Sequence, residues 1–236
     1  MRMRNKPWAK PELEACPFFI KDTESIPGHW LEHFPHQQPF HIELGCGKGG
    51  FMAQAATVNT DINYLALDLE FKMLGVARRK IAAAYEEMNL APENILLCAY
   101  NIEKISDLFL PDEKICDRIY INFCNPWPRK KHQKHRLTHP RQLVQYRGIL
   151  KDGAEIHFKT DDDDLFNDSL GYFEECGFSV TFRTYDLHSS GYAPNIITEH
   201  EKMFSDEGIK IKFLISVKYL QQLLVLFIMI KQNLKK

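Results

Sequence analysis

The chain has little of what would mark a secreted, membrane-spanning or metal-dependent protein. Its six cysteines include no Cys-x-x-Cys pair, and its ten histidines show no ligand spacing typical of zinc. No signal-peptide-like apolar stretch stands at the N-terminus, and the apolar run at 223–230 is far shorter than the roughly 20 residues that span a bilayer. These absences predict a protein of the reducing cytoplasm that needs no metal and contacts no membrane.

The sequence also has no excess of either charge, since 30 lysines and arginines stand against 31 aspartates and glutamates. Nucleic-acid binding would therefore have to come from local clusters of positive charge. Residues 1–10 hold four basic side chains and no acid, and seven of the eight residues at 129–136 are basic or histidine. A solvated helix face usually mixes both signs. We expect the second cluster to contact phosphates through Lys130, Lys131, Lys134 and Arg136.

An apolar run at 119–123 comes just before this basic cluster and ends at Asn125-Pro126 and Pro128. Proline donates no backbone hydrogen bond, so the pattern predicts a buried strand that stops in a rigid loop carrying Asn125 and Trp127. A flat aromatic ring beside a dense positive patch suits a ligand that carries both bases and phosphates.

Strand and helix patterns alternate along the rest of the chain. Strands are expected at 40–44, 64–69, 94–99, 115–123, 154–159, 179–185 and 210–218. Helices are expected at 51–57, 72–88, 137–150 (ending at Asp152-Gly153) and 165–176. This alternation predicts an α/β protein with a doubly wound parallel sheet. We expect one domain at 36–218, preceded by an irregular basic arm at 1–35 with one short helix and followed by an extension at 219–236 with no assigned role.

The glycine loop after the first central strand, Gly45-Cys46-Gly47-Lys48-Gly49-Gly50, fits two patterns. It satisfies both the dinucleotide fingerprint and the GxGxG pattern typical of methyltransferases. Glu43 favours the second, because a carboxylate two residues before the first glycine would repel a pyrophosphate, whereas S-adenosylmethionine carries an ammonium and a sulfonium. Asp68, at the end of the next strand, is placed to accept hydrogen bonds from ribose hydroxyls, with Glu70 as the rival.

Four successive aspartates at 161–164 could suggest a metal site. They lack the spacing and the glycine of a calcium loop. We therefore expect the run to begin a helix, with Asp161 turned into the cleft.

Five segments, in this order, closely resemble the bacterial tRNA (guanine-N7)-methyltransferases: IELGCGKGGF, YLALDLE, INFCNPWPRKKHQKHRLTHPRQL, IHFKTDDDDLF and NIITEHEKMF. The resemblance covers about residues 38–215. It implies a class I S-adenosylmethionine-dependent methyltransferase, with a Rossmann-like, doubly wound, mostly parallel sheet and an antiparallel C-terminal strand. The implied reaction is methyl transfer to N7 of a guanosine in the variable loop of tRNA, by a monomer or a homodimer.

The same resemblance implies roles for individual residues. Asn125 would serve both catalysis and cofactor binding, although that family commonly has Asp at 101 and 125 and Lys at 129. The implied cofactor residues are Glu43, Gly45, Gly47, Asp68, Asn101 and Asn125. The implied guanine and tRNA contacts are Arg129, Asp161, Thr198, Glu199, His200 and Glu201.

The chemistry itself asks little of the protein beyond alignment. Guanine N7 carries an in-plane lone pair and no proton, so its attack needs no general base. The purine becomes cationic as the methyl group arrives, and an acceptor such as the Asn125 oxygen or Asp161 can offset that charge.

Base selection is expected to depend on Glu201. A carboxylate can accept hydrogen bonds from the N1-H and N2-H donors of guanine at once, and adenine offers no such pair. The segment that carries Glu201 follows Gly191 and Pro194 and is expected to be a flexible loop that closes over the cleft.

Two other functions remain compatible with the sequence. A nicotinamide-dependent oxidoreductase would share the fold and the glycines, but no acid-base pair for hydride transfer can be assigned and Glu43 opposes it. A non-catalytic RNA-binding protein would keep the basic clusters, and Asn101 and Asn125 are its best support. Binding of S-adenosylmethionine distinguishes the latter from an enzyme.

Overall fold

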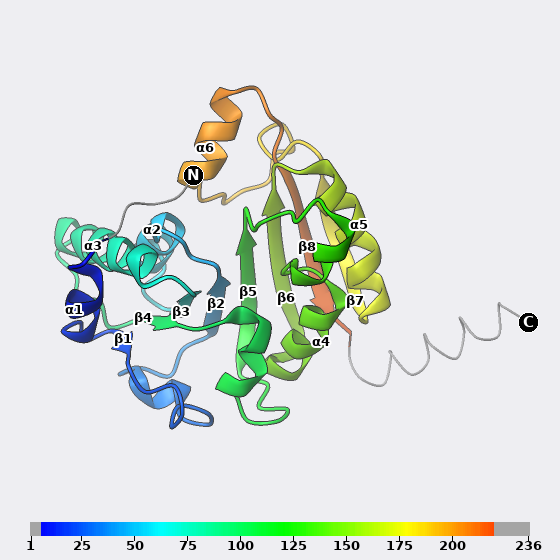
Figure 1. Cartoon of the computed structure of the whole chain (residues 1–236). Helices are drawn as coiled ribbons and strands as arrows, with labels where there is room; N and C mark the ends of the chain where they lie inside the picture. The colour runs from blue at the N-terminus through cyan, green and yellow to red at the C-terminus, as the bar shows by residue number, and fades with distance from the viewer. Residues whose placement is uncertain (1–5, 220–236) are drawn as a thin grey trace, which may run out of the picture.

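The computed structural model describes residues 6–219, and its centre is one eight-stranded sheet in the order β1-β4-β3-β2-β5-β6-β8-β7 (Figure 1). The first six strands in this order run parallel to one another, while β8 pairs antiparallel with both β6 and β7. The strands are β1 (Phe19–Ile20), β2 (Phe40–Leu44), β3 (Asn63–Asp68), β4 (Ile95–Ala99), β5 (Cys116–Asn122), β6 (Leu150–Thr160), β7 (Phe178–Thr184) and β8 (Lys212–Lys218). The predicted doubly wound sheet with an antiparallel C-terminal strand is confirmed.

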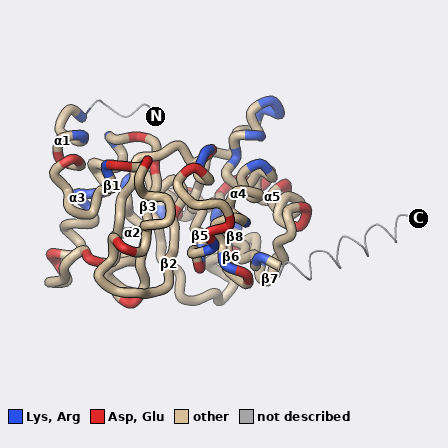
Figure 2. The backbone as a smooth tube through the Cα atoms, turned by 90° about the horizontal axis from the view of Figure 1, so that it is seen from below, with Lys and Arg blue, Asp and Glu red and all other residues tan. Residues whose placement is uncertain are grey.

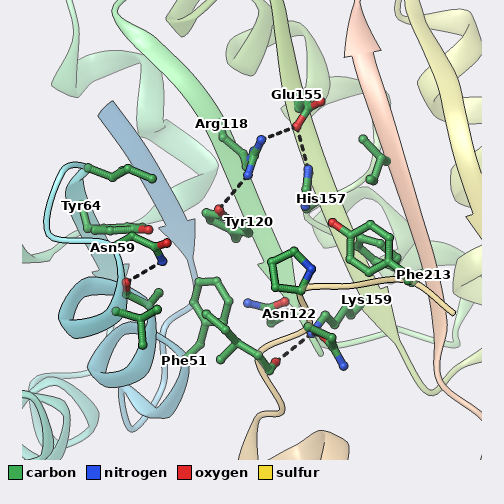
Figure 3. Close-up of a pocket in the computed structure, with 18 residues that line it drawn as sticks. Phe51, Asn59, Tyr64, Arg118, Tyr120, Asn122, Glu155, His157, Lys159 and Phe213 are labelled. Atoms are coloured by element: carbon green, nitrogen blue, oxygen red, sulfur yellow. Dashed lines mark hydrogen bonds and ion pairs between the residues drawn. The ribbon is translucent and has the colours of Figure 1, made fainter. Parts of the chain in front are cut away.

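Helices connect the strands and cover both faces of this sheet. Side chains alternate along a strand, so neighbouring residues of β5 and β6 point to opposite faces. Tyr120 packs on Phe51 of α2 and on His157 (Figure 3), whereas Phe158 points the other way and stacks on Phe166 of α5. The helices are α1 (Ala9–Glu14), α2 (Gly50–Val58), α3 (Phe71–Glu87), α4 (Pro140–Ile149), α5 (Asp163–Glu175) and α6 (Glu199–Asp206), with 3-10 segments η1 (Trp30–His33), η2 (Ile102–Leu108) and η3 (Lys130–His135).

Two predicted boundaries are wrong for local reasons. The helix expected from 137 begins only at Pro140, because His139 takes extended backbone angles and its ring nitrogen accepts from the Arg141 amide as an N-terminal cap. The strand expected at 154–159 starts directly after that helix and spans Leu150–Thr160, so Asp152 and Gly153 lie within the strand and not in a turn.

The described part of the predicted irregular arm contributes to the core. Its one predicted short helix, α1, is present, and β1 adds an unpredicted edge strand beside β4. Trp30 is fully buried and donates from its indole nitrogen to the Leu108 carbonyl at 2.7 Å. Residues 1–5, and the predicted extension beyond Tyr219, lie outside the described residues.

Basic and acidic positions are interspersed over the described chain, and neither sign forms one continuous face in the view of Figure 2. No helix within residues 6–219 is long and apolar enough to cross a membrane. Nor do the described residues contain a group of three or more His, Cys, Asp or Glu side chains that could hold a metal ion.

Candidate active site

The carboxyl ends of β2, β3 and β5 meet at the point where the strand order reverses. From β2 the sheet extends on one side through β3 and β4, and on the other side through β5 and β6. Ligands of open α/β sheets bind at such a switch point. The glycine loop joins β2 to α2 here, and Gly45, Gly47 and Gly49 all have positive φ angles. The site predicted around the glycine loop therefore lies where this fold accommodates ligands.

Two glycines of the loop have different surroundings. A Cβ on Gly49 would come within 2.7 Å of the Ala77 Cβ, so Gly49 allows α2 and α3 to pack closely. A Cβ on Gly47 would meet nothing within 4 Å, and the Gly47 amide donates to Asp68 at 2.9 Å. Open space beside a backbone amide is what a ligand that approaches the loop requires.

Asp68 ends β3 and faces the glycine loop. Its carboxylate accepts from the backbone amides of Gly47 and Glu70, both at 2.9 Å. Burial raises its pKa, although these amides oppose the shift. Glu70 instead turns to solvent and pairs with Lys72 at 2.8 Å. Of the two acids weighed for the ribose, Asp68 is the one that lies against the loop.

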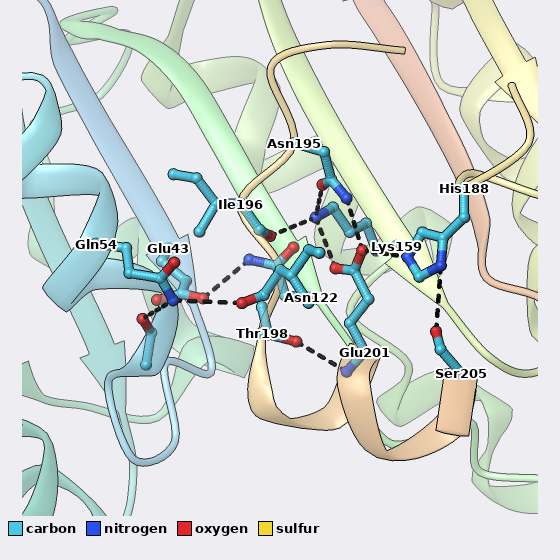
Figure 4. Close-up of polar contacts among 12 residues, drawn as sticks. Glu43, Gln54, Asn122, Lys159, His188, Asn195, Ile196, Thr198, Glu201 and Ser205 are labelled. Atoms are coloured by element: carbon cyan, nitrogen blue, oxygen red, sulfur yellow. Dashed lines mark hydrogen bonds and ion pairs between the residues drawn. The ribbon is translucent and has the colours of Figure 1, made fainter. Parts of the chain in front are cut away.

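Glu43 is buried on β2, next to Asn122 at the end of β5. Its Oε1 accepts from the Asn122 amide at 3.0 Å (Figure 4), while its Oε2 is buried and has no hydrogen-bond partner among the described residues. Burial raises the pKa of Glu43 to about 7, with the charge of Asp68 adding to the rise and the Asn122 hydrogen bond opposing it. An unpartnered buried carboxyl oxygen is costly unless a ligand donates to it.

The two asparagines expected at the cofactor lie in exposed loops after β4 and β5. The Asn101 oxygen accepts from the Glu103 amide at 3.0 Å and caps η2, and the Asn125 oxygen accepts from the Trp127 amide at 3.0 Å. Phe123 and Trp127 have positive φ angles, so the loop around Asn125 is strained. Both amide oxygens thus hold their loops in shape, and each keeps a second lone pair for a ligand.

The basic segment after this loop forms η3. Arg129, Lys130, Lys131 and Lys134 are exposed, and none of them is paired with an acid within residues 6–219. Arg136 differs, because it is 1% exposed, donates to the Pro126 carbonyl at 2.7 Å and pairs with Asp168 at 2.6 Å. The prediction that Arg136 contacts phosphate is therefore wrong for this structure, since its guanidinium is buried and holds the loop to α5.

Asp161 follows β6 at the same edge of the sheet and is partly exposed. Burial raises its pKa. Asp162 caps α5 by accepting from the Leu165 amide at 2.7 Å, so the acidic run does begin a helix as expected.

Helix α6 lies above the carboxyl ends of β5 and β6 (Figure 1). Thr198 caps it by accepting from the Glu201 amide at 3.1 Å, so the segment predicted as a flexible loop is a helix from Glu199 onward. Glu199 pairs with Lys80 of α3, and His200 stacks on Phe123 with ring centroids 6.2 Å apart. These contacts tie both sides of the candidate site to α6.

Glu201 is 0% exposed, and polar groups surround its carboxylate (Figure 4). Oε2 pairs with Lys159 at 3.0 Å, while Oε1 accepts from Asn195 at 2.7 Å and contacts His188 Nε2 at 2.9 Å. Burial acts to raise the pKa of Glu201, but the charge of Lys159 and these hydrogen bonds outweigh it and lower the pKa. In this conformation the carboxylate is committed to the protein, so a contact with guanine would require α6 to move.

Comparison with known proteins decides the family. Residues 37–214 match a family model described as "Putative methyltransferase". A tRNA (guanine-N(7)-)-methyltransferase of Clostridium beijerinckii is 56% identical over 92% of this chain and 99% of its own length. The protein of that name from Acetivibrio thermocellus is 48% identical over 92% of this chain and all of its own length. The chain belongs to this family.

Solved structures show the same fold at low sequence identity. An antibiotic-related methyltransferase covers 85% of this chain and 99% of its own with a TM-score of 0.55 and 17% identity. The aminoglycoside resistance methyltransferase NpmB1 covers 80% of this chain and 91% of its own, with a TM-score of 0.54 and 17% identity. The predicted class I methyltransferase fold is confirmed, and the oxidoreductase alternative is excluded by family membership.

Sequence reasoning missed four residues of the site. Asn122 contacts Glu43, while Lys159, His188 and Asn195 surround Glu201. A polar residue closing an apolar strand is a usable signal for Asn122 and Lys159. Nothing in the sequence indicates that His188 and Asn195, in a long connection, would turn back onto α6.

Proposed function

We propose that this protein transfers a methyl group from S-adenosylmethionine to N7 of a guanosine in the variable loop of tRNA. The observation that carries the proposal is the 56% identity to a tRNA (guanine-N(7)-)-methyltransferase over 99% of that relative's length. The arrangement of Glu43, Asp68 and the glycine loop at the switch point supports it. We place the enzyme in the cytoplasm, acting as a monomer or a homodimer, with residues 36–218 as its catalytic domain between the arm and the C-terminal extension.

The residues at the switch point fit the cofactor. Asp68 and Asn101 would accept from and donate to the nucleoside part, and the open side of Gly47 gives the cofactor room. The unpartnered Oε2 of Glu43 would accept from the ammonium group. S-adenosylmethionine, when bound, supplies a methyl group on a positively charged sulfur. Gly45 and Asn125 complete the proposed cofactor site.

The protein's part in the reaction is to hold the guanine with N7 facing the methyl group and to exclude other bases. Alignment of reacting atoms is worth up to ~7 to 11 kcal/mol in favourable intramolecular reactions. Asp161 and the second lone pair of the Asn125 oxygen would stabilise the positive charge that develops on the purine. Arg129, Thr198, Glu199 and His200 would line the path of the nucleotide, and Lys130, Lys131 and Lys134 would contact phosphates.

Transfer of a radiolabelled methyl group to an unmodified tRNA transcript tests this function. A transcript made with 7-deazaguanosine in place of guanosine is the matched control, because it keeps the base-pairing edge and lacks the N7 acceptor. The proposal expects label on the first transcript and none on the second. Equal labelling of both transcripts would show that the methyl group is transferred to an atom other than N7. No S-adenosylmethionine binding in calorimetry would instead support the non-catalytic RNA-binding alternative.

A further inference from the structure

A separate cavity lies on the face of the sheet that α2 covers in part. It has a volume of about 370 Å³ and is enclosed by β5, β6, β8, α2 and the segment at 192–196 (Figure 3). Three of its lining residues, Asn122, Lys159 and Asn195, contact Glu43 or Glu201 of the candidate site, but none of the described residues that line it is itself a cofactor or tRNA contact proposed above. Cavities of about 300 to 1,000 Å³ are the size of small-molecule sites.

Aromatic rings form the floor and two sides of this cavity. Tyr120, His157 and Phe213 make a continuous row, with centroids 5.5 and 5.7 Å apart. Phe51 stands against one end of the row, 4.8 Å from Tyr120, and Tyr192 stands against the other, 4.8 Å from Phe213. Neighbouring rings of the row meet edge to face, with interplanar angles of 73° and 66°, so a flat ligand ring can stack on one of them at a time.

The charges that line the cavity are already balanced. Arg118 pairs with Glu155 at 2.7 Å, and Lys159 pairs with Glu201 at 3.0 Å. His157 Nε2 contacts the same Glu155 carboxylate at 2.8 Å, and burial lowers the pKa of its ring. A phosphate would therefore find no uncommitted cation here, and an uncharged ligand is favoured.

Polar groups nevertheless face into the cavity among the rings. Arg118 lines the cavity with a guanidinium that pairs with Glu155 and donates to the Tyr120 hydroxyl at 3.3 Å. Asn59, Asn122 and Asn195 also line the cavity. Their amide nitrogens donate to the Ala55 carbonyl, Glu43 and Glu201, respectively, and each nitrogen keeps a second N–H for a ligand. A nucleobase is a flat, neutral ring edged with hydrogen-bond donors and acceptors, so it matches this lining.

We propose that this cavity binds one nucleobase, stacked on a ring of the Tyr120–His157–Phe213 row with its edge toward Arg118 and the asparagine amides. The base can belong to a free nucleoside or to an unstacked nucleotide of an RNA chain. Binding of an RNA nucleotide rests on the proposed function, whereas binding of a free nucleoside does not. Lys159 donates to the Ile196 carbonyl at 2.9 Å, so the segment over the cavity is tied to the network around Glu201.

A blocking variant at the mouth tests the site. Val58 lines the cavity but is 72% exposed at the end of α2, so Val58→Arg fills the mouth without entering the core. Val144→Arg is the matched control, since Val144 is 62% exposed on α4 and does not line the cavity. Guanosine, adenosine, cytidine and uridine are titrated by ligand-observed NMR, with the cofactor site saturated by S-adenosylhomocysteine.

The proposal expects saturable binding of at least one nucleoside to wild type, at least tenfold weaker binding to Val58→Arg and a change below twofold in Val144→Arg. Tyr192→Ala, which removes one aromatic side of the slot, should also weaken binding and serves if Val58→Arg does not fold. Absence of nucleoside binding to wild type, or unchanged affinity in Val58→Arg and Tyr192→Ala, overturns the proposal. Equally tight binding of p-cresol, a flat ring without a base edge, overturns it as well.

Affinity for unmodified tRNA identifies the source of the base. A tenfold loss in Val58→Arg, with Val144→Arg unchanged, assigns the cavity to a nucleotide of the RNA. Unchanged tRNA affinity together with nucleoside binding assigns it to a free nucleoside. Because the nucleoside titration involves no methyl transfer, its result is independent of whether the proposed reaction is correct.

Discussion

Lys159 and Glu201 form an ion pair at 3.0 Å in which the lysine side chain is 7% exposed and the glutamate 0%. Lys159 is on β6 and Glu201 is in the first turn of α6, so the pair fastens the helix over the carboxyl ends of the strands. A buried pair of this kind contributes little net stability, but removal of one partner leaves an uncompensated charge. Glu201 therefore has a structural role in addition to the base selection that the sequence predicts for it.

Glu201→Gln tests both roles. Loss of the charge beside Lys159 should lower the free energy of unfolding by up to ~3 to 5 kcal/mol. If the carboxylate also accepts from guanine, tRNA methylation should fall roughly ten- to hundredfold with cofactor affinity unchanged, because a mismatched contact costs ~1 to 3 kcal/mol. Urea denaturation and steady-state kinetics measure the two effects.

Lys159→Met is the control for this variant, since it breaks the same ion pair and keeps the carboxylate. Preference for guanine over adenine should survive in Lys159→Met and be lost in Glu201→Gln. Equal loss in both would show that Glu201 acts only by positioning α6, and Asp161 would become the better candidate for base selection.

Asp68→Ala should weaken S-adenosylmethionine binding by ~2 to 3 kcal/mol, the value of charge-assisted hydrogen bonds to hydroxyls, and leave the fold intact. Glu70→Ala is the matched control, because Glu70 is two residues away, exposed and paired with Lys72. Calorimetry measures both affinities. Normal binding in Asp68→Ala with weak binding in Glu70→Ala would transfer the ribose contact to Glu70.

The two glycines of the loop should respond differently to alanine. Gly47→Ala adds a methyl group to open space, so it should cost only the ~1 to 2 kcal/mol of a positive φ but obstruct cofactor binding. Gly49→Ala has the same backbone cost and a clash with Ala77, worth a further ~1 to 3 kcal/mol in stability. Thermal melting and calorimetry compare them. Full cofactor affinity in Gly47→Ala would mean that no ligand approaches this face of the loop.

The raised pKa of Glu43, about 7, predicts a pH dependence of stability. The folded protein keeps a proton that the unfolded chain releases above its ordinary pKa of 4.5. The free energy of unfolding should therefore fall as pH rises from about 4.5 to about 7, by roughly 3 kcal/mol at most. Glu43→Gln should remove this fall in denaturant titrations.

Cofactor affinity should change in the opposite direction. A cationic group binds the ionised carboxylate, so affinity for S-adenosylmethionine should rise between about pH 6 and pH 8 in wild type. The cofactor's own amino group titrates equally in both proteins, so the difference from Glu43→Gln isolates Glu43. Parallel pH profiles for the two proteins would contradict the ammonium contact.

Removal of two basic side chains from η3 tests the phosphate contacts. Lys130→Ala/Lys131→Ala should weaken binding of all tRNAs alike and flatten the log-log salt dependence by nearly one unit per contact. Lys114→Ala/Lys151→Ala is the control, since these lysines pair with acids near the amino ends of β5 and β6. An unchanged salt slope in the η3 variant would mean that this face is only solvated.

Much of the fold follows from local pattern. The apolar run at β2, the glycines after it and the acid that ends β3 all fall within residues 40–68, one strand–helix–strand unit, so their placement needed no knowledge of more distant contacts. Strand β1 was not predictable, because its two residues gain their hydrogen bonds only from β4. The 3-10 segments are too short for their sequences to show a helical period of apolar residues.

The site was less predictable wherever it depends on pairs distant in sequence. Arg136 belongs to a run of exposed cations, yet its partner Asp168 on α5 draws it into the interior. The sequence predicts Glu201 as a base contact in a flexible loop, and only its position opposite Lys159 shows that it is buried. The cavity beside Tyr120 likewise forms from strands and a connection that the chain brings together only on folding.

The position of the new methyl group on the RNA tests the proposed reaction. Unmodified tRNA transcript is incubated with the protein and S-adenosylmethionine, reduced with borohydride and treated with aniline, which cleaves the chain at 7-methylguanosine. We predict one new cleavage, at a guanosine of the variable loop, that Asp68→Ala reduces. An intact transcript that has nevertheless incorporated methyl label, or cleavage confined to guanosines elsewhere, would show that the protein does not methylate N7 of a variable-loop guanosine.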